Sequence, residues 1–252
     1  ITIKSEREIE LMAEAGKILE RVHNELEKAL RPGMSTKDID TLGEEIIRSY
    51  GCIPSFLNYN GYPASICVSV NQEVVHGIPD KHRIIQEGDI VSLDAGVIYK
   101  GYHSDAARTH AVGEVSEEAK KLIQVTKESF FEGIKFAKAG NHLFDISGAI
   151  GRYAEERGYG VVRDLCGHGI GTALHEAPEI PNYEVGRKGV RLRPGMTLAI
   201  EPMINIGTHE VDWLDDDWTV VTRDGSLSAH YENTILITEG EPRILSLTCD
   251  NE

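Results

Sequence analysis

The feature that most constrains the fold is an internal repeat, because landmarks in the first half of the chain recur 107 positions later. The recurring pairs are Gly33 and Gly140, Asp38 and Asp145, Ile39 and Ile146, Gly51 and Gly158, Gly88 and Gly195, and Asp94 and Glu201. Among 25 glycines some offset will match by chance, but helix-ending glycines that match together with a strand acid make chance the weaker explanation. Two halves of one plan, related by an approximate twofold axis, would place their equivalent acids face to face.

Local patterns predict two helices followed by strands in the first half. Ser5-Glu6-Arg7-Glu8 matches a capping box and opens a helix that ends at Arg31-Pro32-Gly33. A second helix stops at Gly51, and strands are expected at residues 65–70, 90–97 and 102–112.

The second half repeats this order. Ser116 caps a helix that breaks at Ala139-Gly140, and another helix runs to Gly158. Strand-like segments follow around Val161 and at residues 196–206, 218–222 and 230–238. We therefore expect an α+β fold in a single domain, built of related halves at about 1–112 and 113–248, with residues 249–252 as a disordered tail.

Composition excludes several classes of protein. The net charge of −15 makes the chain a poor binder of a phosphate backbone or an anionic membrane. The four cysteines contain no Cys-x-x-Cys pair, and no apolar stretch reaches the ~18 residues of a membrane helix. Ile-Thr-Ile-Lys-Ser-Glu at the start does not resemble a signal peptide. We expect a cytoplasmic protein that is not secreted.

Two acids lie within apolar strands. Asp94 follows Ile90-Val91-Ser92-Leu93, and Glu201 follows Thr197-Leu198-Ala199-Ile200. A buried carboxylate without a partner is costly, so it either takes up a proton or finds a cation. Either acid alone could equally belong to the polar face of an alternating strand.

A hairpin makes a cation more plausible. A turn at Tyr99-Lys100-Gly101 would bring Asp105 nearly opposite Asp94, where like charges repel unless a counter-charge separates them. Glu232 could serve Glu201 as Asp105 serves Asp94, although the longer connection leaves that pairing open.

Two histidines differ from the others in their surroundings. His168 lies in Gly167-His168-Gly169-Ile170-Gly171, where a backbone can approach a ligand closely, and His175 follows seven residues later. This spacing is not that of two zinc ligands on one helix and indicates two points on a loop. Four carboxylates and one imidazole suit two divalent ions, and an oxygen-rich site favours manganese, iron(II), cobalt or magnesium.

The ordered motifs closely resemble those of methionine aminopeptidases of the type I, bacterial kind, over nearly the whole chain. The motifs are His76-Gly77-Ile78-Pro79, Asp94-Ala95-Gly96, Tyr102-His103-Ser104-Asp105, Gly167-His168-Gly169-Ile170-Gly171 with His175-Glu176 after three residues, Ala199-Ile200-Glu201-Pro202, and Tyr231-Glu232-Asn233-Thr234. The resemblance implies the pseudo-twofold "pita-bread" fold, an antiparallel sheet covered by helices. It also implies removal of the initiator methionine by a hydroxide that bridges two divalent ions, with cobalt, manganese or iron(II) as candidates.

The resemblance assigns roles position by position. Asp94 would chelate one metal, Asp105 and Glu232 would bridge both, and His168 and Glu201 would complete the other shell, with Glu201 also as proton acceptor. His175 would contact the scissile amide or the developing oxyanion, and His76 the substrate or the leaving amine. The methionine pocket would be formed by Tyr59, Tyr62, Cys67, Trp218 and Leu174, with Phe56 nearby, although position alone distinguishes these from core residues.

Two positions depart from the family pattern. Leu174 is often phenylalanine in relatives, and Leu165 stands where a larger side chain is common, so both should affect the shape of the pocket. The partners implied are the N-terminal methionine of peptides and nascent proteins, with the ribosome as one setting, and neither nucleic acid nor membrane. We expect a monomer.

Three alternatives share the fold. Proline-specific peptidases usually carry an additional N-terminal domain, for which residues before Ser5 leave no room. Type II methionine enzymes carry a large insertion that the chain is too short to hold after His175. Non-catalytic binding proteins on this scaffold typically lose metal ligands, whereas all five are present here. The acidic run Asp215-Asp216-Asp217 is interpreted as a solvated hairpin tip, with a role at the rim of the pocket through Trp218 as the alternative.

Overall fold

The structure, a computed structural model, describes residues 1–247. Its helices are α1 (Glu6–Ala29), α2 (Thr36–Ser49), α3 (Glu117–Ile134) and α4 (Leu143–Glu155), with a short 3₁₀ helix at Tyr59–Gly61. The tail expected at residues 249–252 lies outside the described residues. Within the described part, no helix is long and apolar enough to cross a membrane.

Helix starts follow the sequence signals more closely than helix ends do. Ser5 caps α1 by accepting a hydrogen bond from the Glu8 amide, and the Glu8 carboxylate accepts one from the Ser5 amide in return. The Ser116 side chain caps α3 by accepting a hydrogen bond from the amide of Ala119, without the reciprocal bond seen in α1. However, α3 ends at Ile134, ahead of the break expected at Ala139-Gly140, because a helix end frays into irregular turns before a glycine is reached.

The strands form one large sheet and two small ones, and their pairing is antiparallel throughout the described residues. The large sheet has the order β1-β4-β5-β14-β9-β7-β8, with β2 on β4 and β15 on β14. Its strands are β1 (Ile53–Pro54), β2 (Ile66–Val70), β4 (Ile90–Tyr99), β5 (Tyr102–Ala111), β7 (Gly167–Gly169), β8 (Glu176–Ile180), β9 (Thr197–Ile200), β14 (Glu232–Leu236) and β15 (Arg243–Ile244). The small sheets contain β13 (Ser228–His230), β10 (Met203–Asn205) and β6 (Gly160–Val161), and β11 (Val211–Trp213), β12 (Val220–Thr222) and β3 (Glu73–Val75).

Two long strands expected in the second half are each broken in two. The segment 196–206 divides at Pro202 into β9 and β10, which belong to different sheets, and the segment 230–238 divides at Tyr231 into β13 and β14. Proline has no amide hydrogen to donate to a strand ladder, so Pro202 ends the pairing of β9. Glu201 therefore follows the end of a strand instead of lying within one.

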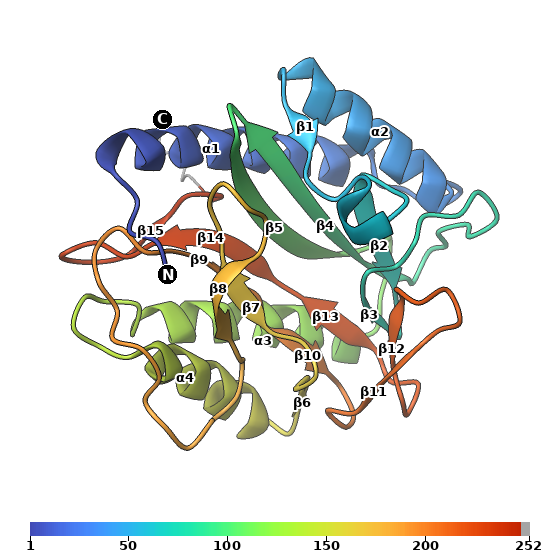
Figure 1. Cartoon of the computed structure of the whole chain (residues 1–252). Coiled ribbons are helices and arrows are strands. Elements are labelled where there is room, and N and C mark those ends of the chain that lie inside the picture. Colours follow the sequence, from blue (N-terminus) through green and yellow to red (C-terminus); the bar gives the residue numbers. More distant parts are fainter. Residues whose placement is uncertain (248–252) are drawn as a thin grey trace.

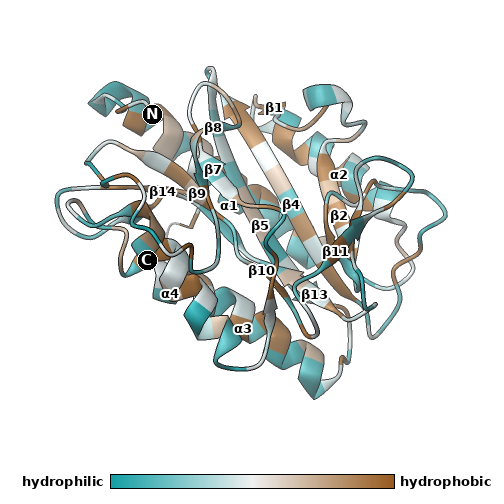
Figure 2. Cartoon of the chain, turned by 60° about the horizontal axis from the view of Figure 1, so that its bottom comes forward, coloured by the Kyte–Doolittle hydropathy of each residue, from teal (hydrophilic) through white to brown (hydrophobic). Residues whose placement is uncertain are grey.

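Each pair of helices covers its own part of the strands (Figure 1). Helices α1 and α2 pack with β2, β4 and β5 around one buried cluster that includes Leu19, Ile47 and Leu93. Helices α3 and α4 pack around another that includes Phe130, Ile146 and Leu198. Hydrophobic residues concentrate on the helix faces and strands that meet in these layers (Figure 2). Burial of these apolar faces holds the sheet in place.

The central pair of the large sheet joins the two halves of the chain. Strand β5 pairs with β14, while β4 lies outside β5 and β9 lies outside β14. This order is what a twofold axis between β5 and β14 would produce. The division into halves at about 1–112 and 113–248 stays a prediction.

We predict that Gly16→Ala destabilises the protein. A Cβ at Gly16 would lie 1.9 Å from the carbonyl oxygen of Leu245, so α1 would have to move away from the backbone beside it. Such overpacking typically costs about 1–3 kcal/mol, which urea unfolding would measure. Glu10→Ala, at an exposed position of the same helix, should change stability by less than about 0.5 kcal/mol. Equal stability of Gly16→Ala and wild type would contradict this packing.

Candidate metal centre

One cavity is lined by every residue that the sequence assigned to the site. These residues are Phe56, Tyr59, Tyr62, Cys67, His76, Asp94, Asp105, His168, Leu174, His175, Glu201, Trp218 and Glu232. Asn60, which the sequence analysis did not single out, lines it as well. Leu165 does not line it, but packs against the cluster around Val162 and Met203, and its expected effect on the shape of the pocket stays a prediction.

Three acids share one face of the central strands. Asp94 on β4 and Glu232 on β14 both pair with Ala107 of β5, so they stand at the same level on either side of a small residue. Asp105 pairs with Gly96, which makes it a diagonal neighbour of Asp94 instead of one nearly opposite. Cross-strand partners point to the same side of a sheet, so all three carboxylates converge.

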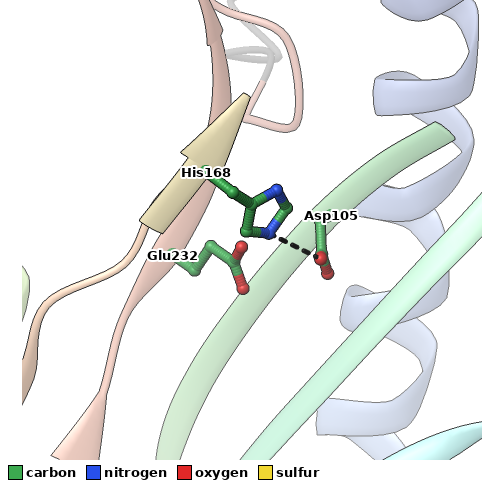
Figure 3. Close-up of side chains that lie close together, drawn as sticks. All are labelled: Asp105, His168 and Glu232. Atoms are coloured by element: carbon green, nitrogen blue, oxygen red, sulfur yellow. Dashed lines mark ion pairs between the residues drawn. The ribbon is translucent and has the colours of Figure 1, made fainter. Parts of the chain in front are cut away.

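The other two predicted ligands come from the neighbouring strands. His168 on β7 pairs with Ala199 of β9, and Glu201 follows β9 directly. The Nε2 atom of His168 lies 3.6 Å from Oδ2 of Asp105 and 3.5 Å from Oε1 of Glu201. Asp105, His168 and Glu232 are buried and lie close enough together to hold one ion, as Figure 3 shows.

The backbone around His168 sets the direction of its ring. Nδ1 lies 2.8 Å from the carbonyl oxygen of Gly169, so the hydrogen is on Nδ1 and the lone pair of Nε2 faces the carboxylates. Burial lowers the pKa of His168 to about 4, which keeps the ring neutral. The flanking glycines allow close packing, because a Cβ would lie 2.4 Å from the Ala199 oxygen at Gly167 and 2.2 Å from the Ala177 oxygen at Gly169.

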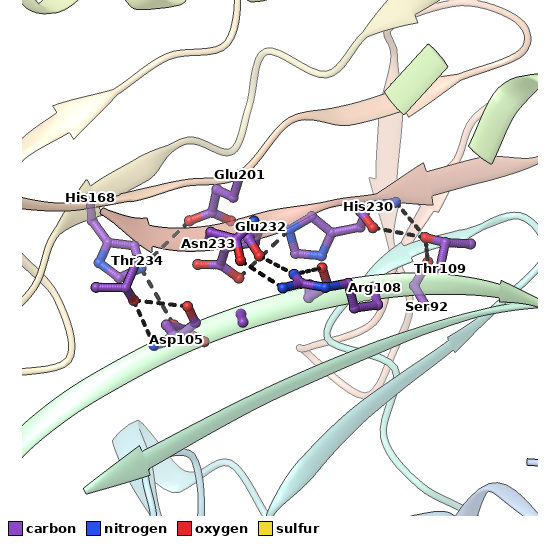
Figure 4. Close-up of polar contacts among 12 residues, drawn as sticks. Ser92, Asp105, Arg108, Thr109, His168, Glu201, His230, Glu232, Asn233 and Thr234 are labelled. Carbon is purple, nitrogen blue, oxygen red and sulfur yellow. Dashed lines mark hydrogen bonds and ion pairs between the residues drawn. The ribbon is translucent and has the colours of Figure 1, made fainter. Parts of the chain in front are cut away.

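No basic side chain neutralises the carboxylates within the described residues. Arg108 is the nearest candidate, but its guanidinium donates to the carbonyl oxygen of Glu232 and to the side-chain oxygen of Asn233 (Figure 4). One oxygen each of Asp94, Asp105 and Glu232 is buried and accepts no hydrogen bond. One oxygen of each of these three carboxylates is therefore left without a hydrogen-bond partner.

Burial and mutual repulsion raise the pKa values of the four acids. Burial raises the pKa of Asp94, Glu201 and Glu232 well above their usual ranges, and nearby Asp105 raises each pKa further. Burial raises the pKa of Asp105 to about 7. Four such acids, with free oxygens and a neutral imidazole among them, fit divalent cations with oxygen and nitrogen ligands.

Two histidines and an aromatic wall surround the acids. The hydroxyl of Tyr59 lies 2.8 Å from Nδ1 of His175, whose ring also meets that of His168 edge to face at 4.3 Å. His76 has a left-handed backbone with φ of 60°, a conformation that is uncommon outside glycine and concentrated at functional sites. Trp218 meets the rings of both His76 and Tyr62 edge to face.

The apolar part of the cavity belongs to one packed cluster. Phe56, Tyr62, Cys67 and Leu174 are buried in it, and Tyr59 and Trp218 pack against it. Cys67 pairs with Asp94 across β2 and β4, so the thiol borders both the apolar wall and the acids. Burial raises the pKa of Cys67 well above its usual range, which keeps the thiol protonated and apolar in character.

One residue that sequence reasoning missed lies beside the ligands. His230 is 1% exposed, and with Glu201 and Glu232 it forms a second group close enough to hold an ion. Its position two residues before Glu232 gave a signal, since alternate strand residues share a face. The break at Tyr231 separates the two strands and obscures this pattern.

Comparison with known proteins places the chain among metallopeptidases. Residues 10–239 match the model of metallopeptidase family M24. A methionine aminopeptidase of Clostridium acetobutylicum is 58% identical over 247 residues, which cover 98% of this chain and 99% of that protein. The crystal structure of a methionine aminopeptidase from Thermotoga maritima superposes with a TM-score of 0.96 at 48% identity, covering 98% of this chain and 100% of that one.

A proline-specific peptidase, the main alternative, has the same fold but is less similar in sequence. A Xaa-Pro dipeptidase of Bacillus anthracis superposes with a TM-score of 0.78 at 28% identity, covering 98% of this chain and 62% of that one. The expected pita-bread fold is thereby confirmed, and so is the resemblance to the bacterial methionine enzymes.

The raised pKa values predict how the metal-free protein responds to pH. These carboxyls bind protons more tightly in the folded than in the unfolded protein, where their pKa is about 4, so folding stability falls as the pH rises from about 4 through about 7. A bound cation replaces those protons and removes the repulsion. We expect the increase in Tm caused by Mn(II) to grow from about pH 5 to about pH 8 in scanning calorimetry.

Asp94→Asn serves as the matched control for this measurement, because it removes one of the coupled carboxylates. Its Mn(II)-induced increase in Tm should depend less on pH. A wild-type increase that is constant with pH, or larger at the acidic end, would contradict the electrostatic account of the site.

Proposed function

The chain belongs to metallopeptidase family M24, and from that premise we propose that it acts as a methionine aminopeptidase on peptides and nascent proteins. The observation that carries the proposal is the convergence of unpartnered buried carboxylates and a neutral imidazole beside an apolar cavity. The identity of 58% with a methionine aminopeptidase, against 28% with a Xaa-Pro dipeptidase, favours methionine over proline specificity.

The ligands proposed for two divalent ions are Asp94, Asp105, His168, Glu201 and Glu232. When bound, such ions polarise the scissile carbonyl and lower the pKa of water enough for it to attack. Cobalt, manganese and iron(II) all suit this mixture of carboxylates and imidazole. Two ions would balance the charge of the four carboxylates.

The proton-handling roles follow from position. Glu201 lies at the edge of the acid group, with 14% of its side chain exposed, so it can accept a proton from the attacking water. Burial lowers the pKa of His175 to about 4, so the ring is neutral, and a hydrogen bond donated by the Tyr59 hydroxyl to Nδ1, 2.8 Å away, would place the ring hydrogen on Nε2. That hydrogen can be donated to the scissile amide or to the developing oxyanion.

Recognition of the substrate has an apolar and a polar part. Tyr62, Cys67, Leu174 and Trp218, with Phe56 and Tyr59, provide an apolar wall that suits a methionine side chain. The free α-amine of the substrate would approach the acids, and an internal peptide has no such group. His76, beside Trp218, is placed to contact the substrate or the leaving amine.

The setting in the cell is also a proposal. The net charge of −15 disfavours binding to nucleic acid or an anionic membrane. We propose that the protein works as a monomer in the cytoplasm, on N-terminal methionine of peptides and of chains emerging from the ribosome.

Peptide hydrolysis tests the proposed activity. Metal-stripped protein should release methionine from Met-Ala-Ser only after Mn(II) or Co(II) is added, and it should leave the N-acetylated peptide intact. Cleavage of Ala-Pro-Ala instead would assign the protein to the proline-specific peptidases. Bound metal without cleavage of any peptide would favour a non-catalytic binding protein.

Loss of a ligand should abolish turnover. Asp94→Asn or Glu232→Gln should lower kcat/KM by more than about 100-fold. Removing a residue that only hydrogen-bonds to a metal ligand typically costs at most about 100-fold, so a larger loss indicates a ligand. Isothermal titration calorimetry should show weaker binding of one Co(II) equivalent. Near-normal activity of either variant would remove that residue from the metal site.

His175→Ala should separate chemistry from metal binding. Removal of a hydrogen-bond donor to the oxyanion lowers kcat by about 100- to 1,000-fold, while the metal content measured by atomic absorption should stay the same. Tyr59→Phe, which removes only the partner of Nδ1, should have a smaller effect. Loss of metal in His175→Ala would make His175 a ligand.

A further inference from the structure

His230 is a buried imidazole that faces two of the proposed ligands. Its Nε2 atom lies 3.6 Å from Oε2 of Glu201 and 3.9 Å from Oε2 of Glu232 (Figure 4). The side chain is 1% exposed, and neither ring nitrogen has a hydrogen-bond partner. Burying a polar group without a hydrogen-bond partner costs folding free energy, so the position of this imidazole beside the carboxylates calls for an explanation.

The two oxygens of Glu201 are divided between two imidazoles. Oε1 lies 3.5 Å from Nε2 of His168, and Oε2 lies 3.6 Å from Nε2 of His230. If Oε1 binds the cation beside His168, Oε2 is left facing His230 alone. A carboxylate that binds a metal is usually oriented by a hydrogen bond to its other oxygen.

The backbone of His230 is fixed so that the ring keeps this direction. The hydroxyl of Thr109 accepts a hydrogen bond from the His230 amide at 2.9 Å and lies 2.8 Å from the His230 carbonyl oxygen. Ser92 lies 2.8 Å from the same hydroxyl and holds Thr109 in turn. This arrangement ties β13 to β5 at the residue that carries the ring.

His230 also borders a second cavity, separate from the one that holds the acids. Its lining includes the polar residues Arg108, Thr109 and His110. Nδ1 of His230 has no hydrogen-bond partner in the structure, and a donor in this cavity that bonded to Nδ1 would leave the hydrogen on Nε2. The ring would then present a donor to the carboxylates and an acceptor to the cavity behind it.

We propose that His230 is a positioning residue, which directs the hydrogen of Nε2 towards the Oε2 atoms of Glu201 and Glu232, 3.6 and 3.9 Å away, and so orients both carboxylates for the metal. The inference rests on the metal site of the proposed function. The role of hydrogen-bond donor suits His230 better than the role of ligand to a third ion, because two divalent ions already balance the charge of four carboxylates. A third ion would add uncompensated charge to a buried site.

Metal binding by His230→Leu and His230→Gln tests the proposal. Leucine fills similar space without a donor, whereas glutamine retains a side-chain N–H of comparable reach. By calorimetry with Co(II), His230→Leu should bind one equivalent about 10- to 100-fold more weakly, the usual effect of removing such support. His230→Gln should recover most of this loss, and the visible absorption of bound Co(II) should shift in the leucine variant only.

Kinetics on Met-Ala-Ser should follow the same order. With saturating Co(II), His230→Leu should lower kcat more than it changes KM, since His230 does not line the cavity that would take the substrate. His110→Leu is the matched control, because His110 borders the same second cavity but faces Glu27, with Nδ1 3.6 Å from Oε1. Its metal affinity should equal that of wild type.

Three outcomes would overturn the proposal. These are wild-type metal affinity in His230→Leu, equal losses in the leucine and glutamine variants, or loss of a third Co(II) equivalent, which would make His230 a ligand. Thermal unfolding of the metal-free variants shows whether each is folded. Wild-type protein that binds Co(II) but cleaves no peptide would refute the proposed function, while calorimetry would still decide the role of His230.

Discussion

The repulsion among buried carboxylates is the interaction on which the arrangement of the site depends. Asp94, Asp105 and Glu232 converge because a three-stranded register places them on one face, with only the methyl group of Ala107 between two of them. Without a counter-charge, these acids would take up protons or the strands that carry them would be pushed apart. The charge of a divalent cation turns the same convergence into a favourable interaction, so the site and the ion stabilise each other.

The surrounding hydrogen bonds hold backbones and leave the carboxylates free. Thr234 bonds both the amide and the carbonyl of Asp105, and Arg108 reaches the carbonyl of Glu232. Asn182 reaches the carbonyl of Glu201. A guanidinium aimed at a carboxylate would have competed with the cation. The backbones of Asp105, Glu201 and Glu232 are thus fixed in place, and no arginine or lysine in the described residues neutralises their carboxylates.

Local sequence was sufficient to predict one hairpin and two helix starts, although it placed the end of α3 too late. The hairpin at Tyr99–Tyr102 and the capped starts of α1 and α3 follow from a few adjacent residues. The placement of Glu201 beside Glu232 depends on pairing between strands that are far apart in sequence, which local patterns do not predict. The apolar run also continues past Pro202, so it did not indicate that β9 ends at Ile200. The burial of His230 does not follow from local sequence, because a polar residue near a strand end usually faces solvent. Only tertiary packing places its side chain in the interior.

The acids and the aromatic wall are held in place by different parts of the structure. The acids are fixed by the register of the central strands, whereas the wall belongs to a cluster that also contains Met12 and Leu245. Leu174 lies in that cluster, outside the strands that carry the acids. A change there alters the shape of the pocket through core packing, and the carboxylates keep their positions. The shape of the cavity and the arrangement of the acids can therefore change independently of each other.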